Sequence, residues 1–550
     1  MAIEWWWLRA GVFLLPLAYT WDTYDRFVLP KLLLARVLVI GLLILFVARS
    51  VMSGGLTIRR TPLDLPILVF VVSAVVSTIF AFNQNVAVFG TYTRYDGLLT
   101  AVTYAGLFLL SVQALADRDE ARTLLRFLLA SGYLVAAVAI IQSVTDAVAQ
   151  QSFVPAFGTL GQKNVLGMFL AMLAPLAFRE VVEADAWSKR IVALNAFAVI
   201  AIALVLTLSR SAWLGAAIAG VVLLFGRYRP SLRVVIAGIS VTLIVGGVIA
   251  AFSIITPHQQ ERRPDIWLDT LSLIASRPLV GYGPDNFGLV YPRFQSKELG
   301  TQQVDKAHAE VLQVAATQGV IGLAAYGLIL VGLVRAFWRG RERPWAVAML
   351  AALTAYQVTI QLNFTALAAA LPFWVVAAAA VEVWGATRVT RIPLVHRRLS
   401  ALAGAVPIAA LLALTVVGVL RPYLADSRLL AAVQADVEGR SAAAQAPARQ
   451  ARELAPRESV YAVEVANIAF ERGDWVRAAD AYLDAAALGT YNPLVYRNLA
   501  LADRNLGHLS EARAAARKAF ELDRYDPANR ALVAQLQALS RNQSSAKRDS

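Results

Sequence analysis

The 550-residue sequence contains no cysteine and only four histidines. Without cysteine, the chain has no disulfide, no cysteine-ligated metal and no thiol nucleophile. None of the histidines shows a metal-ligand spacing such as His-x-x-x-His, so we expect neither a metal nor another cofactor. Charged residues make up only 16% of the chain, whereas 58% of its residues are hydrophobic. This balance is typical of a multi-pass membrane protein and excludes an ordinary soluble one.

Long hydrophobic runs fill the first three quarters of the chain and predict an all-α fold. A helix needs about 20 residues to cross a hydrocarbon core of roughly 30 Å. Runs of this size predict a transmembrane helical bundle over residues 1–420. Spans are expected near residues 5–20, 31–48, 64–82, 98–116, 125–146, 165–181, 191–208, 212–226, 233–255, 311–337, 345–363, 368–386 and 399–420. The Trp5-Trp6-Trp7 cluster in the first run indicates a retained helix with an interfacial anchor rather than a cleaved signal.

The net charge of +14 is distributed in a way that predicts the orientation of the bundle. Alternate short loops are basic, at residues 49–60, 118–122, 179–190, 227–233, 335–343 and 388–398. The positive-inside rule places these loops and the N-terminus in the cytoplasm. An odd count of thirteen spans then places the C-terminal segment outside it. Because the excess charge sets the topology, no nucleic acid partner is implied.

The C-terminal part, residues 421–540, is rich in alanine, arginine and glutamate and shows a 34-residue repeat. Matching positions are Ala466 and Ala500, Gly473 and Gly507, Ala478 and Ala512, and Pro493 and Pro527. This period resembles tetratricopeptide repeats, which stack helix pairs into an α-solenoid with a concave surface for protein partners. The helical stretch over residues 422–455 is expected to complete the stack, and residues 541–550 are expected to be disordered.

One arginine lies within a long apolar stretch of the predicted bundle. Between residues 191 and 226 the only charged side chain is Arg210, in the string Leu-Ser-Arg-Ser-Ala-Trp. This stretch is too long for one span, so the chain must turn near Arg210, on the extracytoplasmic side. A charge at the membrane edge is costly and usually marks a site that needs fixed positive charge. The alternative is an arginine that extends toward the lipid headgroups.

A loop over residues 256–309 is too long for a simple connection, which indicates a function. It contains Arg263 and Trp267 at the start of a helical pattern, and then a turn-rich segment over residues 277–287. A helix that began near Asp305 would place Asp305 and His308 on one face. Asp305 would then orient a neutral His308 that acts as a general base. The alternative for a lone histidine is a capping or interfacial role.

Further polar residues are expected on the same extracytoplasmic side. They are Arg94, in a glycine-bounded segment over residues 90–97, and Lys163 with Asn164, which follow a glycine-rich turn. Together with Arg210 and Arg263, they place several cations at one membrane face. A guanidinium group binds phosphate oxygens in a bidentate manner. Phosphates at this depth belong most naturally to a lipid carrier.

Residues 94–325 resemble the O-antigen ligase and polysaccharide polymerase family of bacterial membrane proteins. The resemblance rests on the order of several short motifs. They are the glycine-rich turn before Asn164, Ser209-Arg210-Ser211-Ala212-Trp213, Arg263 with Trp267, Pro278-Leu279-Val280-Gly281-Tyr282-Gly283, and His308 with Glu310, Leu312, Gln313, Gly319 and Gly322. One departure is Ala309, where the family usually has asparagine.

The resemblance implies a glycosyltransferase of the bacterial inner membrane. Such enzymes move a glycan from undecaprenyl diphosphate to an acceptor hydroxyl of a lipid, glycan or protein, without metal and with inversion. Arg210 and Arg263 would hold the donor diphosphate and His308 would activate the acceptor. Arg94, Lys163, Asn164, Asp305 and Trp267 are expected to bind substrate. The open alternatives are a polymerase or protein O-oligosaccharyltransferase of the same family and, from other classes, a lipid-linked glycan transporter or a membrane scaffold.

Overall fold

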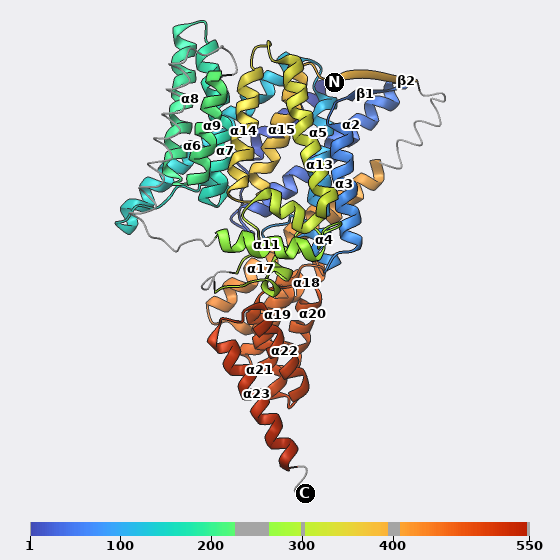
Figure 1. Cartoon of the computed structure of the whole chain (residues 1–550), viewed down its shortest axis with the longest axis vertical. Coiled ribbons are helices and arrows are strands. Elements are labelled where there is room, and N and C mark those ends of the chain that lie inside the picture. Colours follow the sequence, from blue (N-terminus) through green and yellow to red (C-terminus); the bar gives the residue numbers. More distant parts are fainter. Residues whose placement is uncertain (1, 226–262, 299–302, 394–407, 547–550) are drawn as a thin grey trace.

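A computed structural model describes residues 2–225, 263–298, 303–393 and 408–546. The upper part of the molecule is a bundle of upright helices, and a second group of helices is stacked below it (Figure 1). The upright helices are α1 (Ala2–Leu14), α2 (Val28–Ser53), α3 (Asp64–Ile79), α5 (Leu98–Ala114), α6 (Arg118–Gln150), α7 (Lys163–Glu183), α8 (Trp187–Leu206), α9 (Arg210–Phe225), α13 (Glu310–Gly340), α14 (Ala346–Gln361) and α15 (Leu367–Val383). The all-α fold class is confirmed.

Many of the described helices have the apolar composition of membrane spans. Within the described residues, six helices are long and apolar enough to cross a membrane, and five shorter apolar helices accompany them. Wherever the predicted spans are described, they fall on helices; residues 233–255 and 399–407 lie outside the described residues. The first span is shorter than predicted, because α1 ends at Leu14 rather than near residue 20. Pro16 follows directly, and a residue before proline is disfavoured in helical conformation.

One end of the bundle, here called the ribbon end, carries a strand pair that the sequence did not predict. β1 (Gly55–Arg60) and β2 (Arg388–Pro393) pair in antiparallel register, with Gly55 opposite Pro393. The N-terminus lies at this end (Figure 1). Ion pairs fasten the helix ends here, including Arg59 to Glu382 at 2.7 Å and Arg126 to Glu180 at 2.6 Å. The short loops that the sequence predicts as cytoplasmic lie at this end wherever they are described.

The opposite end, here called the loop end, carries the short helices. They are α4 (Gln84–Phe89), η1 (Gly158–Leu160), α11 (Arg263–Ser276), α12 (Phe287–Val290) and η2 (Tyr291–Arg293). α11 lies across the lower end of the upright helices (Figure 1). A small apolar core joins α4, α11, α12 and the start of α13 through Val86, Leu273, Phe287 and Ala316. The predicted helix near Leu271 and the predicted turns over residues 277–287 are both present.

The lower helices form the predicted repeat stack. They pair as α17 (Arg421–Val437) with α18 (Ser441–Leu454), α19 (Ser459–Glu471) with α20 (Trp475–Ala487), and α21 (Pro493–Asn505) with α22 (Leu509–Leu522), and α23 (Pro527–Ala546) covers the last pair. Buried alanines fill the contacts between neighbouring helices. Residues 422–455 form the first of these pairs, α17 with α18.

Two boundaries of the C-terminal part differ from the sequence prediction. One continuous helix runs from Ile408 to Val437, with the π-helix η3 (Val416–Leu420) inside it. The last span therefore enters the first repeat without a loop at residue 421. At the far end, α23 continues to Ala546, so residues 541–546 are helical rather than disordered. A helix that is already packed through Leu532 and Leu536 propagates easily by a further turn.

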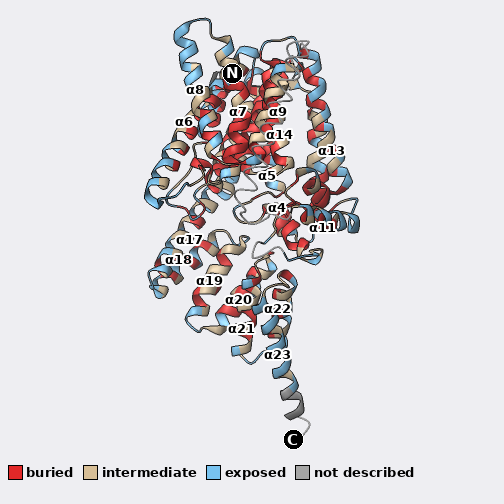
Figure 2. Ribbon diagram, turned by 60° about the vertical axis from the view of Figure 1, so that its left-hand side comes forward, coloured by how far each residue is buried: buried red, intermediate tan, exposed pale blue. Residues whose placement is uncertain are grey.

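Buried residues concentrate inside the upright bundle, whereas the outer faces of α6 and α8 are exposed (Figure 2). α15 lies at the centre, because all of its residues except Trp374 are buried. Its small alanine side chains allow neighbouring helices to approach closely. Because α15 is central, the turn that leads into it lies in the middle of the loop end, among the other helices.

Candidate active site at the loop end

The segment over residues 90–97, here called the arginine loop, closes on itself between α4 and α5. Gly90 has a φ of +83°, and a side chain at Gly97 would approach the backbone nitrogen of Gly90 to 2.5 Å. Thr93 and Tyr95 also adopt left-handed backbone conformations, with φ of 68° and 49°. Such conformations are costly for non-glycine residues and persist only where the surroundings fix them. The arginine loop is thus held in one shape by its contacts.

Three contacts hold the arginine loop to the long loop. The Thr91 backbone nitrogen and hydroxyl donate to Asp285 Oδ2 at 2.7 and 2.9 Å. Arg94 Nε forms an ion pair with Asp305 Oδ2 at 2.6 Å. Asp96 accepts from Lys306 Nζ at 2.7 Å. The predicted substrate-binding residues Arg94 and Asp305 therefore contact each other directly.

Lys306 is a buried cation between the arginine loop and the long loop, and no sequence motif predicts a role for it. Its side chain is 1% exposed and also donates to Asp285 Oδ1 at 2.8 Å. Burial alone would lower the pKa of the Lys306 amine, but the carboxylates of Asp285 and Asp96 outweigh burial and raise it. The amine therefore stays protonated and joins the two loops. Its partners are distant in sequence, so only the tertiary structure reveals this role.

His308 lies beside an aromatic ring that the sequence analysis also missed. The imidazole packs edge-on against Phe364, with ring centroids 5.7 Å apart. The Arg94 guanidinium lies over the same ring, 4.6 Å from its centroid. Phe364 thus contacts the predicted base and one of the predicted cations at the same time.

The predicted pairing of Asp305 with His308 on one helix face is wrong. α13 begins at Glu310, and Ala309 is the extended N-cap residue. His308 has a φ of +52°, outside any right-handed helix. The ion pair of Asp305 with Arg94 and the burial of Lys306 hold residues 305–308 in a non-helical path. Asp305 therefore holds the arginine loop through Arg94.

The turn between α14 and α15, residues 362–366, contacts three of the predicted site residues, Arg94, Arg263 and His308. Arg263 donates to the Leu362 carbonyl, and the Thr365 backbone nitrogen donates to Glu310 Oε2 at 3.1 Å. Asn363 is 1% exposed, and its Nδ2 has no hydrogen-bond partner among the described residues. The sequence signal for this turn is the polar Asn-Phe-Thr string between two apolar spans.

Arg210 is the exposed first residue of α9, at the turn that follows α8. Leu208 turns the chain with a φ of +51°, and Trp213 Nε1 closes the turn by donating to the Leu204 carbonyl at 3.0 Å. Thr359 donates to the Ser211 carbonyl at 3.4 Å, so this turn borders the end of α14. The predicted break in the apolar stretch near Arg210 is confirmed.

The remaining predicted residues lie at the same end of the bundle. Lys163 and Asn164 begin α7, whose Gly167 packs against Ser209 near Arg210. Trp267 lies on α11, one turn after Arg263, and its buried Nε1 has no hydrogen-bond partner among the described residues. The structure therefore brings all eight predicted site residues to the loop end.

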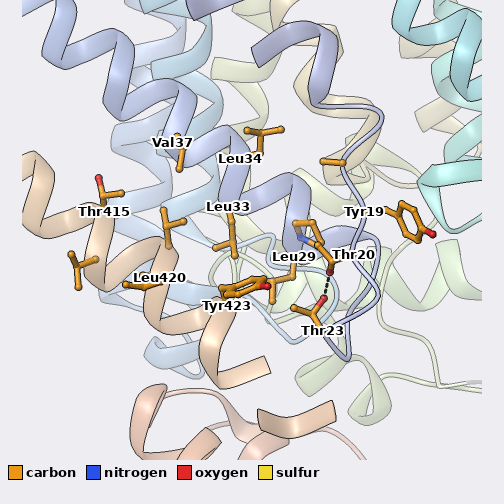
Figure 3. A pocket seen from close by; sticks show the side chains of 14 residues that line it. Tyr19, Thr20, Thr23, Leu29, Leu33, Leu34, Val37, Thr415, Leu420 and Tyr423 are labelled. Atoms are coloured by element: carbon orange, nitrogen blue, oxygen red, sulfur yellow. Dashed lines mark hydrogen bonds between the residues drawn. The ribbon is translucent and has the colours of Figure 1, made fainter. Parts of the chain in front are cut away.

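Two of the cavities in the described part of the chain bear on how this site could hold a donor. A polar cavity of about 310 Å³ is lined by Phe27, Arg94, Asp96, Gln162, Lys306 and Phe364, among others. An apolar groove of about 500 Å³ lies between α2 and the helix that enters the repeats (Figure 3). Leu33 and Leu420 face one another across it, and Thr20 and Thr23 are hydrogen-bonded at its end. The segment over residues 23–30 contributes side chains to both cavities.

Residues 195–327 match the family model described as O-antigen ligase. The matched segment is thus similar to the O-antigen ligase family. It covers about a quarter of the chain and includes Arg210, Arg263 and His308. A comparison with curated proteins returns no match. One solved structure, "Crystal structure of APC/C hetero-tetramer Cut9-Hcn1", is similar at 10% sequence identity over 80% of this chain and 76% of that chain, with a TM-score of 0.20. Similarity at this level carries no argument about the fold.

The family match supports a membrane glycosyltransferase-like function for this multi-pass membrane protein. The matched O-antigen ligase segment runs from α8 to the middle of α13 and includes α11. Arg94, Lys163, Asn164 and Phe364 lie outside it. The loop end therefore combines residues of the ligase domain with residues from both flanking parts of the chain.

Proposed function

We propose that this protein is an inner-membrane glycosyltransferase that moves a glycan from undecaprenyl diphosphate to an acceptor hydroxyl. The ribbon end would lie in the cytoplasm, and the loop end with the repeats would lie outside it. The observation that carries the proposal is that Arg210, Arg263 and His308 lie together at the loop end, all three within the segment matched by the ligase family. Arg263 and His308 contact the turn between α14 and α15, and the turn at Arg210 borders the end of α14.

The proposed reaction follows from the charges at the loop end. The acceptor oxygen attacks the anomeric carbon, and the bond from that carbon to the diphosphate oxygen breaks. Negative charge grows on the departing diphosphate, where Arg210 and Arg263 stabilise it more strongly than in the ground state. His308 takes the acceptor proton as the new glycosidic bond forms. Attack opposite the leaving group inverts the anomeric centre, and no metal takes part.

The two cavities give the donor a place with matching chemistry. The polar cavity offers Arg94, Gln162 and the aromatic faces of Phe27 and Phe364, which suit sugar hydroxyls and sugar ring faces. Lys163, Asn164, Asp305 and Trp267 would border or shape this region. The apolar groove along α2 suits the prenyl chain, because burying each CH₂ group contributes about 0.8 kcal/mol.

The position of the repeat stack bears on the identity of the acceptor. The repeat stack lies directly below the loop end (Figure 1). This position favours a protein or a protein-bound glycan as the acceptor or as a partner, although a lipid or glycan acceptor fits the same chemistry. The mass of the transferred product distinguishes a ligase, a polymerase and a protein O-oligosaccharyltransferase.

The test is transfer by the purified full-length protein, given a lipid-linked glycan donor and a candidate acceptor in detergent. We expect Arg210→Ala, Arg263→Ala and His308→Ala each to lower the rate at least 100-fold, since each removes a group that acts in the transition state. Arg341→Ala, at the exposed ribbon end, is the matched control and should retain full activity. Full activity in all three site variants would refute the proposal. Movement of donor across vesicles without a covalent product would instead support a transporter.

A further inference from the structure

The repeat stack is fastened to the loop end through the turns between its repeats. Asn85 Nδ2 donates to the carbonyls of Arg457 and Leu488 at 2.9 and 3.1 Å. Arg524 Nη2 donates to the Pro292 carbonyl at 2.9 Å. These carbonyl and guanidinium groups come from three successive inter-repeat turns, at residues 455–458, 488–492 and 523–526. One edge of the solenoid therefore rests on the membrane domain.

A buried carboxylate lies where the last span enters this stack. Asp426, in α17, is fully buried. Its Oδ2 accepts from the backbone nitrogen of Asp25 at 2.8 Å. Its Oδ1 accepts from the hydroxyl of Tyr92 at 2.6 Å and from that of Tyr461 at 3.2 Å. The carboxylate thus joins the first loop of the bundle, the arginine loop and the second repeat.

The bond to Tyr92 reaches the arginine loop two residues before Arg94. The Tyr92 ring also packs against Tyr24, Tyr95 and Tyr461, with centroids 5.8 to 6.3 Å apart. The other side-chain anchors of this loop, at Thr91, Arg94 and Asp96, all go to residues 285–306. Among the described contacts, the hydrogen bond from Tyr92 to Asp426 is the polar contact that joins the arginine loop to α17.

A hydrogen bond from a phenol to a buried carboxylate is charge-assisted, which makes it stronger than a bond between neutral groups. Its loss leaves the carboxylate short of a donor in a buried environment, so the neighbouring segments shift to restore hydration. Thr93 and Tyr95 hold left-handed conformations on either side of Arg94, and such conformations relax when their anchors are lost.

We infer that Asp426 is a positioning residue for the transfer reaction: through Tyr92 it holds the arginine loop so that Arg94 lies at the polar cavity. This inference rests on the proposed function. The repeat stack then belongs to the apparatus that shapes the donor site, and Asp426 itself touches no substrate.

Two measurements on the full-length protein test this role. Asp426→Ala and Tyr92→Phe should raise the KM for the lipid-linked donor about ten-fold, the size expected for one charge-assisted hydrogen bond, with a smaller change in kcat. Tyr461→Phe is the matched control, because it removes the other phenol hydroxyl from the same carboxylate oxygen and keeps the ring that packs against Tyr92. It should change KM less than two-fold.

Hydrogen–deuterium exchange of residues 90–97 gives a readout that does not depend on activity. Exchange in this segment should rise in Asp426→Ala and Tyr92→Phe and stay unchanged in Asp503→Ala, which loses a buried carboxylate elsewhere in the stack. Tyr92→Phe removes a single oxygen, so it serves even if Asp426→Ala does not fold. Unchanged exchange in Tyr92→Phe, or equal exchange in Asp503→Ala, would overturn the inference. If the wild-type protein transfers no glycan, the proposed function fails. The exchange result then still tests whether Asp426 holds residues 90–97 in place through Tyr92.

Discussion

At the scale of single residues, the loop end depends on charges whose partners lie far away in the sequence. Arg94 stands out in the sequence as a cation in a glycine-bounded segment, but its partner Asp305 follows more than 200 residues later. Lys306 is inconspicuous beside Asp305, although it joins Asp96 and Asp285. A sequence shows that a charge is costly at a position. Only the fold shows which opposite charge compensates for it.

The Lys306 cluster gives a prediction about stability. Lys306→Met should destabilise the protein by about 3 kcal/mol or more, because it leaves two carboxylates without their buried cation. Lys297→Met is the control, since Lys297 forms an ion pair with Asp265 at 2.7 Å but its side chain is 58% exposed. It should cost about 1 kcal/mol at most. Thermal unfolding in detergent measures both effects, and equal shifts in Tm for the two variants would contradict a structural role of Lys306.

The pH dependence of this contribution follows from the raised pKa of Lys306. A group whose pKa is higher in the folded than in the unfolded state stabilises the fold fully below its unfolded value, about 10.4 for lysine. The contribution is lost only as the pH rises above that value. The difference in Tm between the wild type and Lys306→Met should therefore not shrink between pH 6 and pH 9.

At the scale of elements, the spans follow from the sequence, whereas the contacts between them do not. A continuous apolar run has few alternatives to a membrane helix. The β1 and β2 strands were missed because each is short and basic and its partner is more than 300 residues away. The pairing of Asp305 with His308 failed because Ala309 offers no capping side chain that marks the helix start in the sequence. The turn at Phe364 was missed because its role comes from contacts with His308 and Arg94, which lie far away in the sequence.

The apolar groove along α2 gives a prediction at this scale. Leu34→Trp and Val37→Trp would fill the groove that we assign to the prenyl chain. Displacing about two CH₂ groups from it should raise the KM for a long-chain donor roughly ten-fold. A donor with a short, soluble chain should be used equally well by the variants and the wild type.

The control for the groove is Leu68→Trp, on the exposed face of α3. It adds the same bulk to the surface of a neighbouring span, so it should leave both donors unaffected. If the groove variants lose the long-chain and the short-chain donor equally, the substitutions have disturbed the site rather than the chain. That result would remove the groove from the proposed donor path.

At the scale of the whole molecule, the repeat stack is fixed to the membrane domain at several points. The sequence predicts the repeats, because small residues recur with a period of 34, but period alone does not say whether the stack swings freely. The structure adds two kinds of attachment. One is the continuous helix from Ile408 to Val437, and the other is the row of turns that contacts α4 and η2.

The absence of native cysteine allows a direct test of this arrangement. Asn85→Cys and Leu488→Cys, whose parent residues are in hydrogen-bond contact, should join rapidly through a short reducible thiol crosslinker. A control pair, Leu68→Cys with Asn505→Cys, places one thiol on a membrane-facing surface and the other in the stack and should not join. If the docked state is the working state, the crosslinked protein keeps most of its transfer activity. If the stack must detach to deliver an acceptor, crosslinking stops transfer and reduction restores it, and that outcome would contradict a fixed stack.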